Sequence, residues 1–592
     1  MIRAALLLAV ALGGCAAIDT TESQPADAEL GQLMADVWQD RLRFNPYLAT
    51  QVGEPGYNHQ HPDLSPAGVA ARQAADRRAL ARLKAIDAAA LDADGRLNHE
   101  LLRWLLEDGA GTFDPGAGTR GHRFATEQLA VDTLFRGPQH FTQALQVTPF
   151  RSENDYRDYL ARLRGLETVV QQTIDQLQAG IEAGRTVARP VVDRVIGQTR
   201  ALTREDPDAH PLFRPFTELP DGLPATLTAD GRATITDTVI PAYRRFLDYL
   251  VDDYRPAARE TIAATALPDG EAFYAFAIRQ HTTGDLDAET IHRTGLAEVE
   301  RIAAAMAEIR DELGYEGSLV DFGKALREDP RYRFSSGQQA LDAHRAFAKR
   351  IDPLMTQLVG KLPRAPYGVE PMPEGYALAG GAPYYNGPSA DGSRPGNFYV
   401  NTHKPELQPV WSMPALVAHE AVPGHHLQIA LAVEMGELPA FRRYAYYTAY
   451  AEGWALYAES LGDEVGMYAT PEQRFGRLSA EIWRAVRLVV DTGMHARGWS
   501  RQQAIDFAVE YMPEPLERIG AEIDRYIAWP GQALAYKIGQ LKISELRARA
   551  AAALGEAFDK RAFHDAVLGA GSMPLAVLEQ RIEDWIAAQQ AG

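Results

Sequence analysis

The amino-acid sequence predicts a mainly α-helical protein with a small amount of β structure near residue 400. Apolar residues recur at helical spacing in the middle of the chain, and two other long segments have compositions that favour helix. Strand patterns are scarce, and the sequence contains no internal repeat and no central Gly/Ser-rich linker. We therefore expect one unit over residues 30–592, built of two lobes that change near residues 310–330.

The first residues predict export and a lipid anchor. The short positive start, Met1-Ile2-Arg3, precedes an apolar run from Ala4 to Leu12 that is too short to span a bilayer. The run ends in Leu12-Gly13-Gly14-Cys15, which resembles the lipobox of bacterial lipoproteins. In those proteins the Cys becomes the lipidated first residue of the mature chain. We therefore interpret residues 1–14 as a lipoprotein signal peptide rather than a plain signal peptide followed by an incidental Cys.

The residues after the lipobox suit a tether. Cys15 is the only Cys in the chain, so no intramolecular disulfide is possible. Residues 15–29 are mostly polar and have no apolar period, as expected of a flexible connection between a membrane and a domain. We expect a membrane-anchored protein of the cell envelope, on the periplasmic or extracytoplasmic face.

Three segments give the helical prediction and one gives the strand. Residues 156–181 are rich in Leu, Gln and Arg, and residues 541–553 are rich in Ala, Leu and Arg. Between them, apolar residues recur at steps of three and four: Leu296, Val299, Ile302, Met306, Ile309 and Leu313. Asn397 to Thr402 favours a strand, and it follows a Gly/Pro/Ser-rich loop over residues 384–396.

The charge balance argues against a nucleic-acid partner. The formal net charge is −19, and no run of basic residues offers a phosphate-binding surface. The acidity is more typical of a solubility feature than of a site for a basic substrate. The sequence does not indicate an oligomeric state.

A cluster of His and Glu residues predicts a metal site. His419 and Glu420 are followed by Pro423, Gly424, His425 and His426. On an ideal helix, His425 would lie about 240° round from His419, so the two could not share an ion. However, Pro423 cannot donate to the turn before it, and Gly424 permits unusual backbone conformations. A bulged turn there would return His425 to the face of His419. His426 is the alternative ligand by spacing, but it lies about 10.5 Å further along the axis than His419.

A second segment supplies the remaining ligand. A catalytic zinc takes three protein ligands and leaves a fourth position to water. Glu452, in Tyr450-Ala451-Glu452-Gly453-Trp454, is the leading candidate, and an ordinary buried ion pair is the alternative role for it. Glu459 lies two turns further on nearly the same face and is a candidate to orient a ligand His.

These motifs resemble a known bacterial family. His419-Glu420-x-x-Pro423-Gly424-His425, the Glu452-Gly453-Trp454-Ala455 segment and residues 526–539 look like the bacterial domain-of-unknown-function 885 family. The resemblance also takes in residues 389–402 and 491–495. That family is regarded as gluzincin-like candidate metallopeptidases. The resemblance therefore implies a two-lobed helical zincin-type fold with a deep central cleft, similar to thimet oligopeptidase, carboxypeptidase Taq and angiotensin-converting enzyme. Those relatives keep a plain HExxH and an acid four residues after the third ligand, where this chain has Leu456.

The predicted activity is zinc-dependent hydrolysis of peptide bonds in short peptides. Zn²⁺ activates a water molecule, and Glu420 is the expected general base. Candidates for the remaining roles are Tyr536, His495 and Tyr526 as oxyanion donors, Asp491 as an orienting residue, and Arg394, Tyr399, Asn401, Tyr526 and Lys537 as contacts to substrate. For Tyr536 core packing is the alternative role, and for Arg394 it is ordinary surface charge. Two other functions stay open: hydrolysis of a non-peptide amide or ester, and a non-catalytic metal-binding lipoprotein. The presence of Glu420, which is not itself a ligand, argues against the second.

Overall fold

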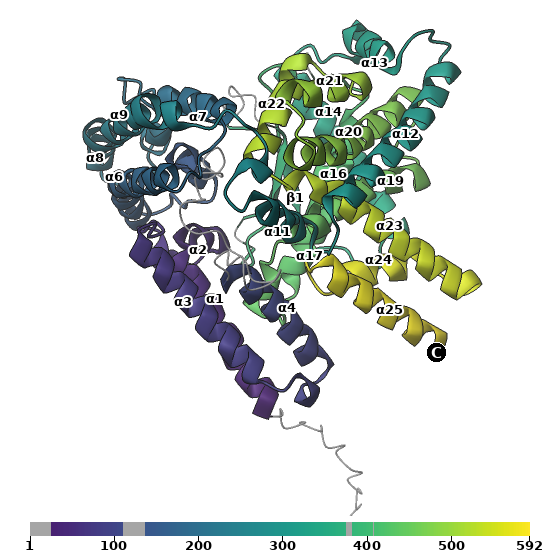
Figure 1. Cartoon of the computed structure of the whole chain (residues 1–592), viewed down its shortest axis with the longest axis horizontal. Coiled ribbons are helices and arrows are strands. Elements are labelled where there is room, and N and C mark those ends of the chain that lie inside the picture. Colours follow the sequence, from purple (N-terminus) through teal and green to yellow (C-terminus); the bar gives the residue numbers. More distant parts are fainter. Residues whose placement is uncertain (1–24, 111–136, 374–381, 393, 406–407, 592) are drawn as a thin grey trace, which may run out of the picture.

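The computed structural model describes residues 25–110, 137–373, 382–392, 394–405 and 408–591 (Figure 1). Cys15 and the signal sequence lie outside these residues, so the lipid anchor stays a prediction. The first helix, α1, begins at Pro25. Residues 25–29, the last five of the expected tether, thus belong to this helix. The apolar face of α1 begins within them, and Leu30, which follows directly, is buried.

The described chain is mainly helical, with one small sheet, as the sequence predicts. Its helices are α1 (Pro25–Phe44), α2 (Pro46–Val52), α3 (Pro66–Ala85), α4 (Ala93–Ala110), α6 (Glu153–Glu182), α7 (Arg189–Ala201), α8 (Thr226–Thr234), α9 (Ile240–Tyr249), α10 (Arg255–Ala257), α11 (Gly270–Thr282), α12 (Ala288–Glu312), α13 (Leu319–Glu328), α14 (Gly337–Ile351), α16 (Met413–Glu420), α17 (His425–Glu434), α18 (Ala440–Arg443), α19 (Thr448–Glu464), α20 (Pro471–Ala496), α21 (Arg501–Tyr511), α22 (Leu516–Ala528), α23 (Ala535–Leu554), α24 (Lys560–Leu568) and α25 (Leu575–Ala591). The strands are β1 (Tyr367–Pro371), β2 (Tyr384–Asn386) and β3 (Gly396–Val400).

The three helices expected from composition and periodicity are present as α6, α12 and α23. In α12 the buried stripe differs slightly from the expected one. Val299, Ile302, Met306 and Ile309 are buried, but Leu296 is 43% exposed. Gly295 faces α20 in its place, so close that a Cβ there would lie 2.7 Å from the Cβ of Leu488. A small residue thus occupies the position where the apolar period led us to expect a leucine.

Three hydrophobic clusters form the interior. The largest joins α1, α3 and α4 to α11, α14, the helices from α16 to α19, and α23 to α25. A second lies among α7, α9, α12 and α20 to α22, and a third fills the space around α6, α8 and α9. Because the largest cluster contains residues from both ends of the chain, the N-terminal helices and the C-terminal helices share one core.

The helices lie in two groups in Figure 1, with α6 to α9 on one side and α11 to α25 on the other. The helix α12, which ends at Glu312, and α13, which lies within residues 310–330, pack against α20 and α21 in the second group. The expected change between lobes near residues 310–330 stays a prediction. The apolar face of α12 is buried along α20, which places residues before 310 in the C-terminal group. The deep cleft implied by the family resemblance stays a prediction.

The sheet has the order β1-β3-β2. β3 pairs with β1 in parallel and with β2 in antiparallel register, so β3 is the central strand. The strand expected at residues 397–402 is thus present over Gly396–Val400, and it is the central strand of the sheet. Its neighbour β2 was not predicted, because β2 is only three residues long and lies inside the expected loop.

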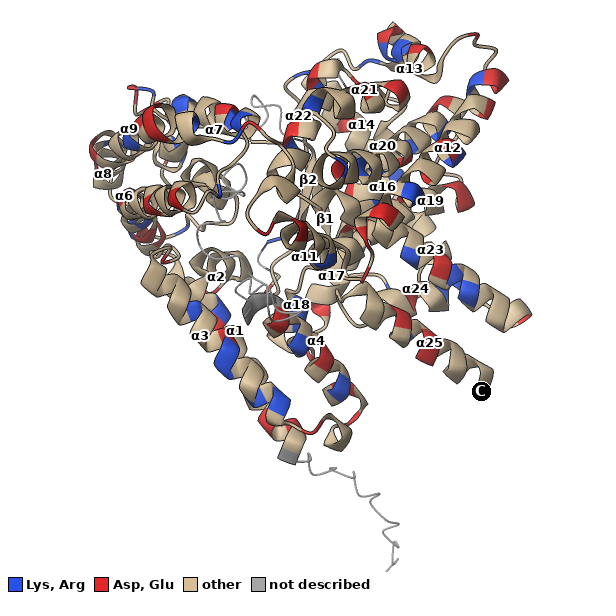
Figure 2. Ribbon diagram, viewed as in Figure 1, with Lys and Arg blue, Asp and Glu red and all other residues tan. Residues whose placement is uncertain are grey.

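Charges of both signs lie along the same helices (Figure 2), as on α3 and α25. Among the described residues, none of the helices combines the length and the apolar character needed to cross a bilayer.

Candidate metal centre

The turn between α16 and α17 brings His419 and His425 together. α16 ends at Glu420 and α17 begins at His425, so the predicted bulge is a complete break between two helices. The backbone N–H of His426 donates to the carbonyl of Ala421 across the break. The rings of His419 and His425 lie 4.8 Å apart between centroids and nearly perpendicular. The break therefore brings His425 next to His419, which a continuous ideal helix would not allow.

Two neighbours fix the shape of this turn. A Cβ on Gly424 would collide with the carbonyl oxygen of His419, so only glycine allows the chain to fold back this closely. The indole N–H of Trp454 donates to the carbonyl of Pro423 at 2.8 Å, and Trp454 is fully buried. Trp454 follows Glu452 by two residues on α19, so this bond also ties the turn to the helix that carries the third candidate ligand.

The position of α19 depends on its contact with α23. A Cβ on Gly453 would lie 2.5 Å from the Cα of Gly539, and a Cβ on Gly539 would collide with the carbonyl oxygen of Ala449. The two helices therefore approach to backbone contact where these glycines meet. This contact sets the distance between Glu452 on α19 and Tyr536 on α23.

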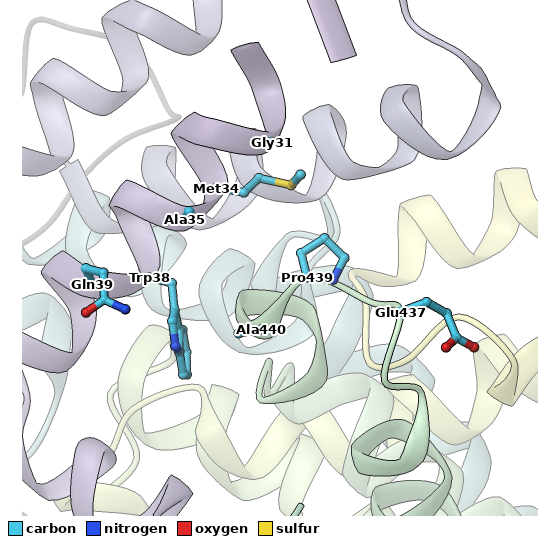
Figure 3. A pocket seen from close by; sticks show the side chains of 8 residues that line it. All are labelled: Gly31, Met34, Ala35, Trp38, Gln39, Glu437, Pro439 and Ala440. Carbon is cyan, nitrogen blue, oxygen red and sulfur yellow. The ribbon is translucent and has the colours of Figure 1, made fainter. Parts of the chain in front are cut away.

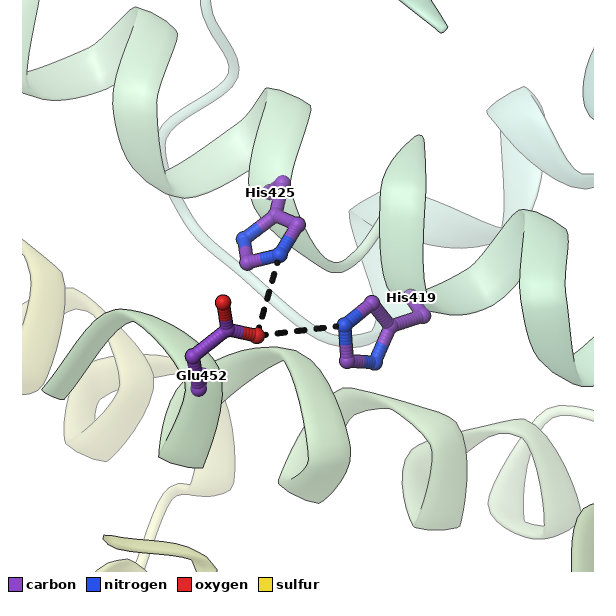
Figure 4. A group of neighbouring side chains, drawn as sticks. All are labelled: His419, His425 and Glu452. Carbon is purple, nitrogen blue, oxygen red and sulfur yellow. Dashed lines mark ion pairs between the residues drawn. The ribbon is translucent and has the colours of Figure 1, made fainter. Parts of the chain in front are cut away.

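His419, His425 and Glu452 point toward one another (Figure 4). Their ligand atoms all lie within 4.8 Å of one another. Glu452 Oε2 is 3.4 Å from His419 Nε2 and 3.4 Å from His425 Nε2. A tetrahedral zinc with ligands at about 2.0–2.1 Å would separate them by about 3.3–3.4 Å. Two imidazoles and a carboxylate are also a donor set that such an ion prefers, so these residues could hold a metal ion.

Hydrogen bonds orient the first of these ligands. Glu459 Oε1 lies 2.8 Å from His419 Nδ1, which leaves Nε2 directed at the cluster. Arg484 of α20 approaches the same Glu459 oxygen at 3.7 Å. Burial lowers the pKa of His419, but the bonds to Glu452 and Glu459 outweigh it and raise that pKa to about 9. Glu459 is thus placed as we expected, and Arg484 is a neighbour that the sequence analysis missed.

Glu420 lies among the ligands without being one of the three. It is 7% exposed, and burial raises the pKa of its carboxyl despite the nearby His419 and His425. Burial also acts on Glu452, but there the two His residues outweigh it and hold the pKa well below the ordinary value. In this site Glu452 is therefore strongly favoured in its charged form, while Glu420 accepts a proton more readily.

His426 is directed away from the cluster. Its Nδ1 lies 2.8 Å from the hydroxyl of Tyr385 on β2, and its ring packs on Tyr367 of β1 with 4.5 Å between centroids. Burial lowers the pKa of His426 to about 4. This residue joins α17 to the sheet, as its neutral form allows, and His425 is the one that faces Glu452.

Two tyrosines lie next to Glu452. The Tyr446 hydroxyl donates to Glu452 Oε1 at 3.0 Å, while the residue as a whole is 56% exposed. Tyr536 is largely buried, and burial together with the charge of Glu452 raises the pKa of its hydroxyl. Tyr536 Oη is 3.4 Å from Gln532 Nε2. Tyr446 was not predicted, because its only signal in the sequence is its place in the tyrosine-rich segment just before α19.

Three other predicted residues have structural partners instead. His495 is fully buried: its Nδ1 accepts from the backbone N–H of Ala264 and its Nε2 donates to the carbonyl of Tyr526. Burial lowers the pKa of His495 to about 4. Both ring nitrogens are occupied, so His495 has no N–H left for a substrate oxyanion.

Asp491 also lies away from the ligands. It accepts from the Tyr274 hydroxyl at 2.6 Å and from the backbone N–H of Gly531 at 3.2 Å. Burial raises the pKa of its carboxyl to about 7. Asp491 therefore holds the turn before α23, rather than a ligand His as we expected.

Lys537 is fully buried. Its Nζ is 2.8 Å from Glu298 and 2.8 Å from Glu481, so two carboxylates occupy its ammonium group. The expected contact of Lys537 to a substrate stays a prediction.

The remaining candidates lie in or near the sheet and at α22. Arg394 donates to the carbonyl of Gly387, Tyr399 stacks on Tyr384, and Asn401 accepts from the backbone of His403. Tyr526 accepts from Arg487 and Trp483 through its hydroxyl and donates to Glu522. Contacts of Arg394, Tyr399 and Asn401 to a substrate stay predictions, while the Tyr526 hydroxyl is occupied within the protein.

A separate cavity lies between α1 and the connection from α17 to α18 (Figure 3). Its volume is about 340 Å³, and Met34, Trp38, Glu437 and Pro439 are among the residues that line it. None of its lining residues belongs to the metal cluster.

Comparisons with known proteins find a family and solved structures to which this chain is similar. Residues 46–582 match a family described as "Bacterial protein of unknown function (DUF885)". The crystal structure of "the putative lipoprotein from Colwellia psychrerythraea" is similar with a TM-score of 0.88 and 30% identity, covering 95% of this chain and 100% of that one. A "putative lipoprotein of unknown function from Shewanella oneidensis" shares the fold, with a TM-score of 0.71 and 18% identity over 93% of this chain and 99% of that one. A comparison with curated proteins finds no match.

Proposed function

The chain belongs to the DUF885 family of bacterial proteins, whose function is unknown, and we propose that it is a zinc-dependent hydrolase of peptide bonds in short peptides. One observation carries the proposal: Glu452 Oε2 lies 3.4 Å from both His419 Nε2 and His425 Nε2, the separation that two ligands of a tetrahedral zinc would have, and Glu420 lies beside them. A purely structural metal site has no need of an additional buried carboxylate at that place. We further propose that the protein acts in the cell envelope, in keeping with its lipobox and with the description of its structural neighbours.

His419, His425 and Glu452 would hold the ion. When bound, zinc would polarise the scissile carbonyl and lower the pKa of a water molecule. The protein's own residues do the rest. Glu420 accepts a proton from the attacking water and passes it to the leaving amine. The raised pKa that burial gives Glu420 suits a group that must both take and return a proton near neutral pH.

Two hydroxyl groups are placed to assist the carbonyl oxygen as it gains charge. Tyr446 donates to Glu452 in the absence of substrate and is exposed enough to meet one. Tyr536 lies on the neighbouring helix, near enough for Glu452 to raise the pKa of its hydroxyl. We propose that at least one of them donates a hydrogen bond to the substrate carbonyl oxygen.

The test is cleavage of a mixed peptide library by the purified protein, with the metal content of the same sample determined. We expect cleavage that needs zinc. In the variant Glu420→Gln we expect an unchanged zinc content and a rate lower by several orders of magnitude, because the general base is removed. A Glu420→Gln protein that cleaves at nearly the wild-type rate would exclude the role assigned to Glu420. A zinc-loaded protein that cleaves no peptide but hydrolyses small esters or amides would show that the substrate is a non-peptide amide or ester.

A further inference from the structure

A cluster of charged and aromatic side chains lies next to Tyr536 and takes no part in the mechanism above. At its centre is Arg487 of α20, which is 8% exposed. Its guanidinium carbon is 4.5 Å from the centre of the Tyr536 ring and 5.6 Å from the centres of the Trp483 and Tyr526 rings. Three aromatic rings therefore surround this guanidinium, which holds it in one place.

One nitrogen of this guanidinium has no acceptor. Arg487 Nε donates to the Tyr526 hydroxyl at 2.8 Å, and Nη2 donates to Glu522 at 3.1 Å. Nη1 is buried and has no hydrogen-bond partner among the described residues. An unpaired donor on a buried charged group is unfavourable, since the group has lost its water without gaining an acceptor.

The charges around Arg487 do not cancel. Glu522 is shared between Arg487 at 3.1 Å and Arg525 at 3.2 Å, so one carboxylate faces two guanidinium groups. Arg525 also donates to Gln532 at 2.7 Å, and Gln532 lies next to the Tyr536 hydroxyl. The cluster thus keeps a net positive charge beside Tyr536.

Comparison with the other buried cations shows what is particular to Arg487. Lys537 is paired with both Glu298 and Glu481. Arg162 and Arg442 also each have an unpartnered nitrogen. Arg162, however, donates to carbonyls of the segment that follows α2, and Arg442 donates to Asn98 and to the carbonyl of Ala570. Within the part of the chain that the structure describes, Arg487 combines an unpaired donor with contact to a tyrosine beside Glu452.

We infer that Arg487 binds the free C-terminal carboxylate of the peptide substrate, with Nη1 donating to it beside Tyr536. This rests on the proposed function, and it makes the protein an enzyme that shortens peptides from the C-terminal end. An extended peptide rises about 3.3–3.6 Å per residue. The Tyr536 ring lies against this guanidinium, and the charge of Glu452 raises the pKa of the Tyr536 hydroxyl. We therefore expect the carboxylate to lie one or two residues beyond the bond that is cleaved. A planar guanidinium with a spare donor is well suited to such an anion.

The first experiment compares two pools of mixed tetrapeptides, one with free C-terminal carboxylates and one with C-terminal amides. With the zinc-loaded protein, mass spectrometry should show the free acids consumed about 10- to 100-fold faster, as expected for loss of a charge-assisted hydrogen bond. The products should be shortened by one or two C-terminal residues. Equal consumption of the two pools would overturn the inference while leaving peptide hydrolysis in place.

The variants are Arg487→Gln and Arg487→Lys. We expect the preference for acids over amides to fall toward one in Arg487→Gln, through an increase in KM, and to fall less in Arg487→Lys, which keeps a positive charge. Arg474→Gln is the matched control. Arg474 lies in the first turn of the same helix, α20, and its partner is the partly exposed Glu312, so the same substitution there leaves the Arg487 cluster intact. A folded Arg487→Gln protein that keeps the full preference would overturn the assignment. If neither variant folds, the comparison of acids with amides in the wild-type protein decides.

A binding measurement separates this inference from the proposed function. The metal-free protein, dialysed against both pools, should retain the acids over the amides about 10-fold or more, and Arg487→Gln should not. Removing the metal matters because a carboxylate could otherwise bind the ion itself. Selective retention without any cleavage by the loaded protein would refute the hydrolase but support the carboxylate site. Retention that is equal for both pools would refute the site.

Discussion

At the scale of single residues, the orientation of two adjacent histidines decides the ligand set. His425 faces Glu452 across 3.4 Å, while His426 binds Tyr385 on the other side of α17. We expect His425→Ala to lose the zinc and His426→Ala to retain most of it, at some cost in stability because the link to the sheet is broken. Elemental analysis of the two purified variants checks this. Zinc loss confined to His426→Ala would reverse the assignment.

The two tyrosines near Glu452 can be ranked by the same kind of argument. We expect Tyr446→Phe to lower kcat by about 10²- to 10³-fold with a smaller change in KM, as loss of an oxyanion donor does. Tyr536→Phe should have a weaker effect on kcat, because the Tyr536 hydroxyl lies beside Gln532 and its ring also supports Arg487. Steady-state kinetics on one peptide distinguish the two. A Tyr446→Phe enzyme within about threefold of wild-type kcat would remove Tyr446 from the mechanism.

Residue types and spacing were enough to predict the three converging side chains. Pro423 and Gly424 indicated that the helix is interrupted between His419 and His425, and Glu452 was the acidic residue expected to join them. The same reasoning could not predict partners from distant parts of the chain. His495 and Asp491 were plausible by type, yet Ala264 and Tyr274 bind them. Tyr446 and Arg487 were missed for the converse reason, since nothing in their immediate sequence shows that Glu452 or Tyr536 lies beside them.

At the scale of elements, the contact between α19 and α23 relates the ligand Glu452 to Tyr536. We expect Gly539→Ala to force the helices apart, because the added methyl group meets the Ala449 carbonyl. Overpacking of this kind costs about 1–3 kcal/mol of unfolding free energy. Activity should fall as well, since Glu452 moves relative to Tyr536.

Gly197→Ala in α7 is the matched control for that substitution. A Cβ there meets nothing within 4 Å. Alanine should therefore stabilise α7 by about 0.5–1 kcal/mol, through its better helix propensity, and leave activity alone. Chemical denaturation and a peptide assay measure both effects. Equal stability and activity in Gly539→Ala and wild type would show that the helices tolerate separation.

The helix α12 was predicted from its apolar periodicity, and α6 and α23 were predicted from their composition. The sheet was harder to predict, because β2 is only three residues long and pairs with β3 from within a segment rich in turn-forming residues. That pairing makes β3 central.

At the scale of the whole molecule, we predict that the position of the protein in the cell depends on Cys15. We expect Cys15→Ser to release the protein from the membrane fraction, because serine cannot carry the lipid and no described helix is suited to span a bilayer. Fractionation of cells that express either form is the measurement, with Glu420→Gln as a control that keeps the lipobox. Membrane association that persists in Cys15→Ser would mean that something other than the lipid holds the protein there.

The packing of α1 bears on where the smallest independently folding piece of this chain begins. The family match starts at residue 46, after α1 has ended. Yet Leu30 and Leu33 are buried in the largest cluster, and Trp38 stacks on Tyr444, two residues before Tyr446, with 5.5 Å between ring centres. A version trimmed to the family boundary would therefore expose that cluster and release the tyrosine segment that borders Glu452. The part of the chain that must be kept together for this fold therefore includes α1, which lies before the family match.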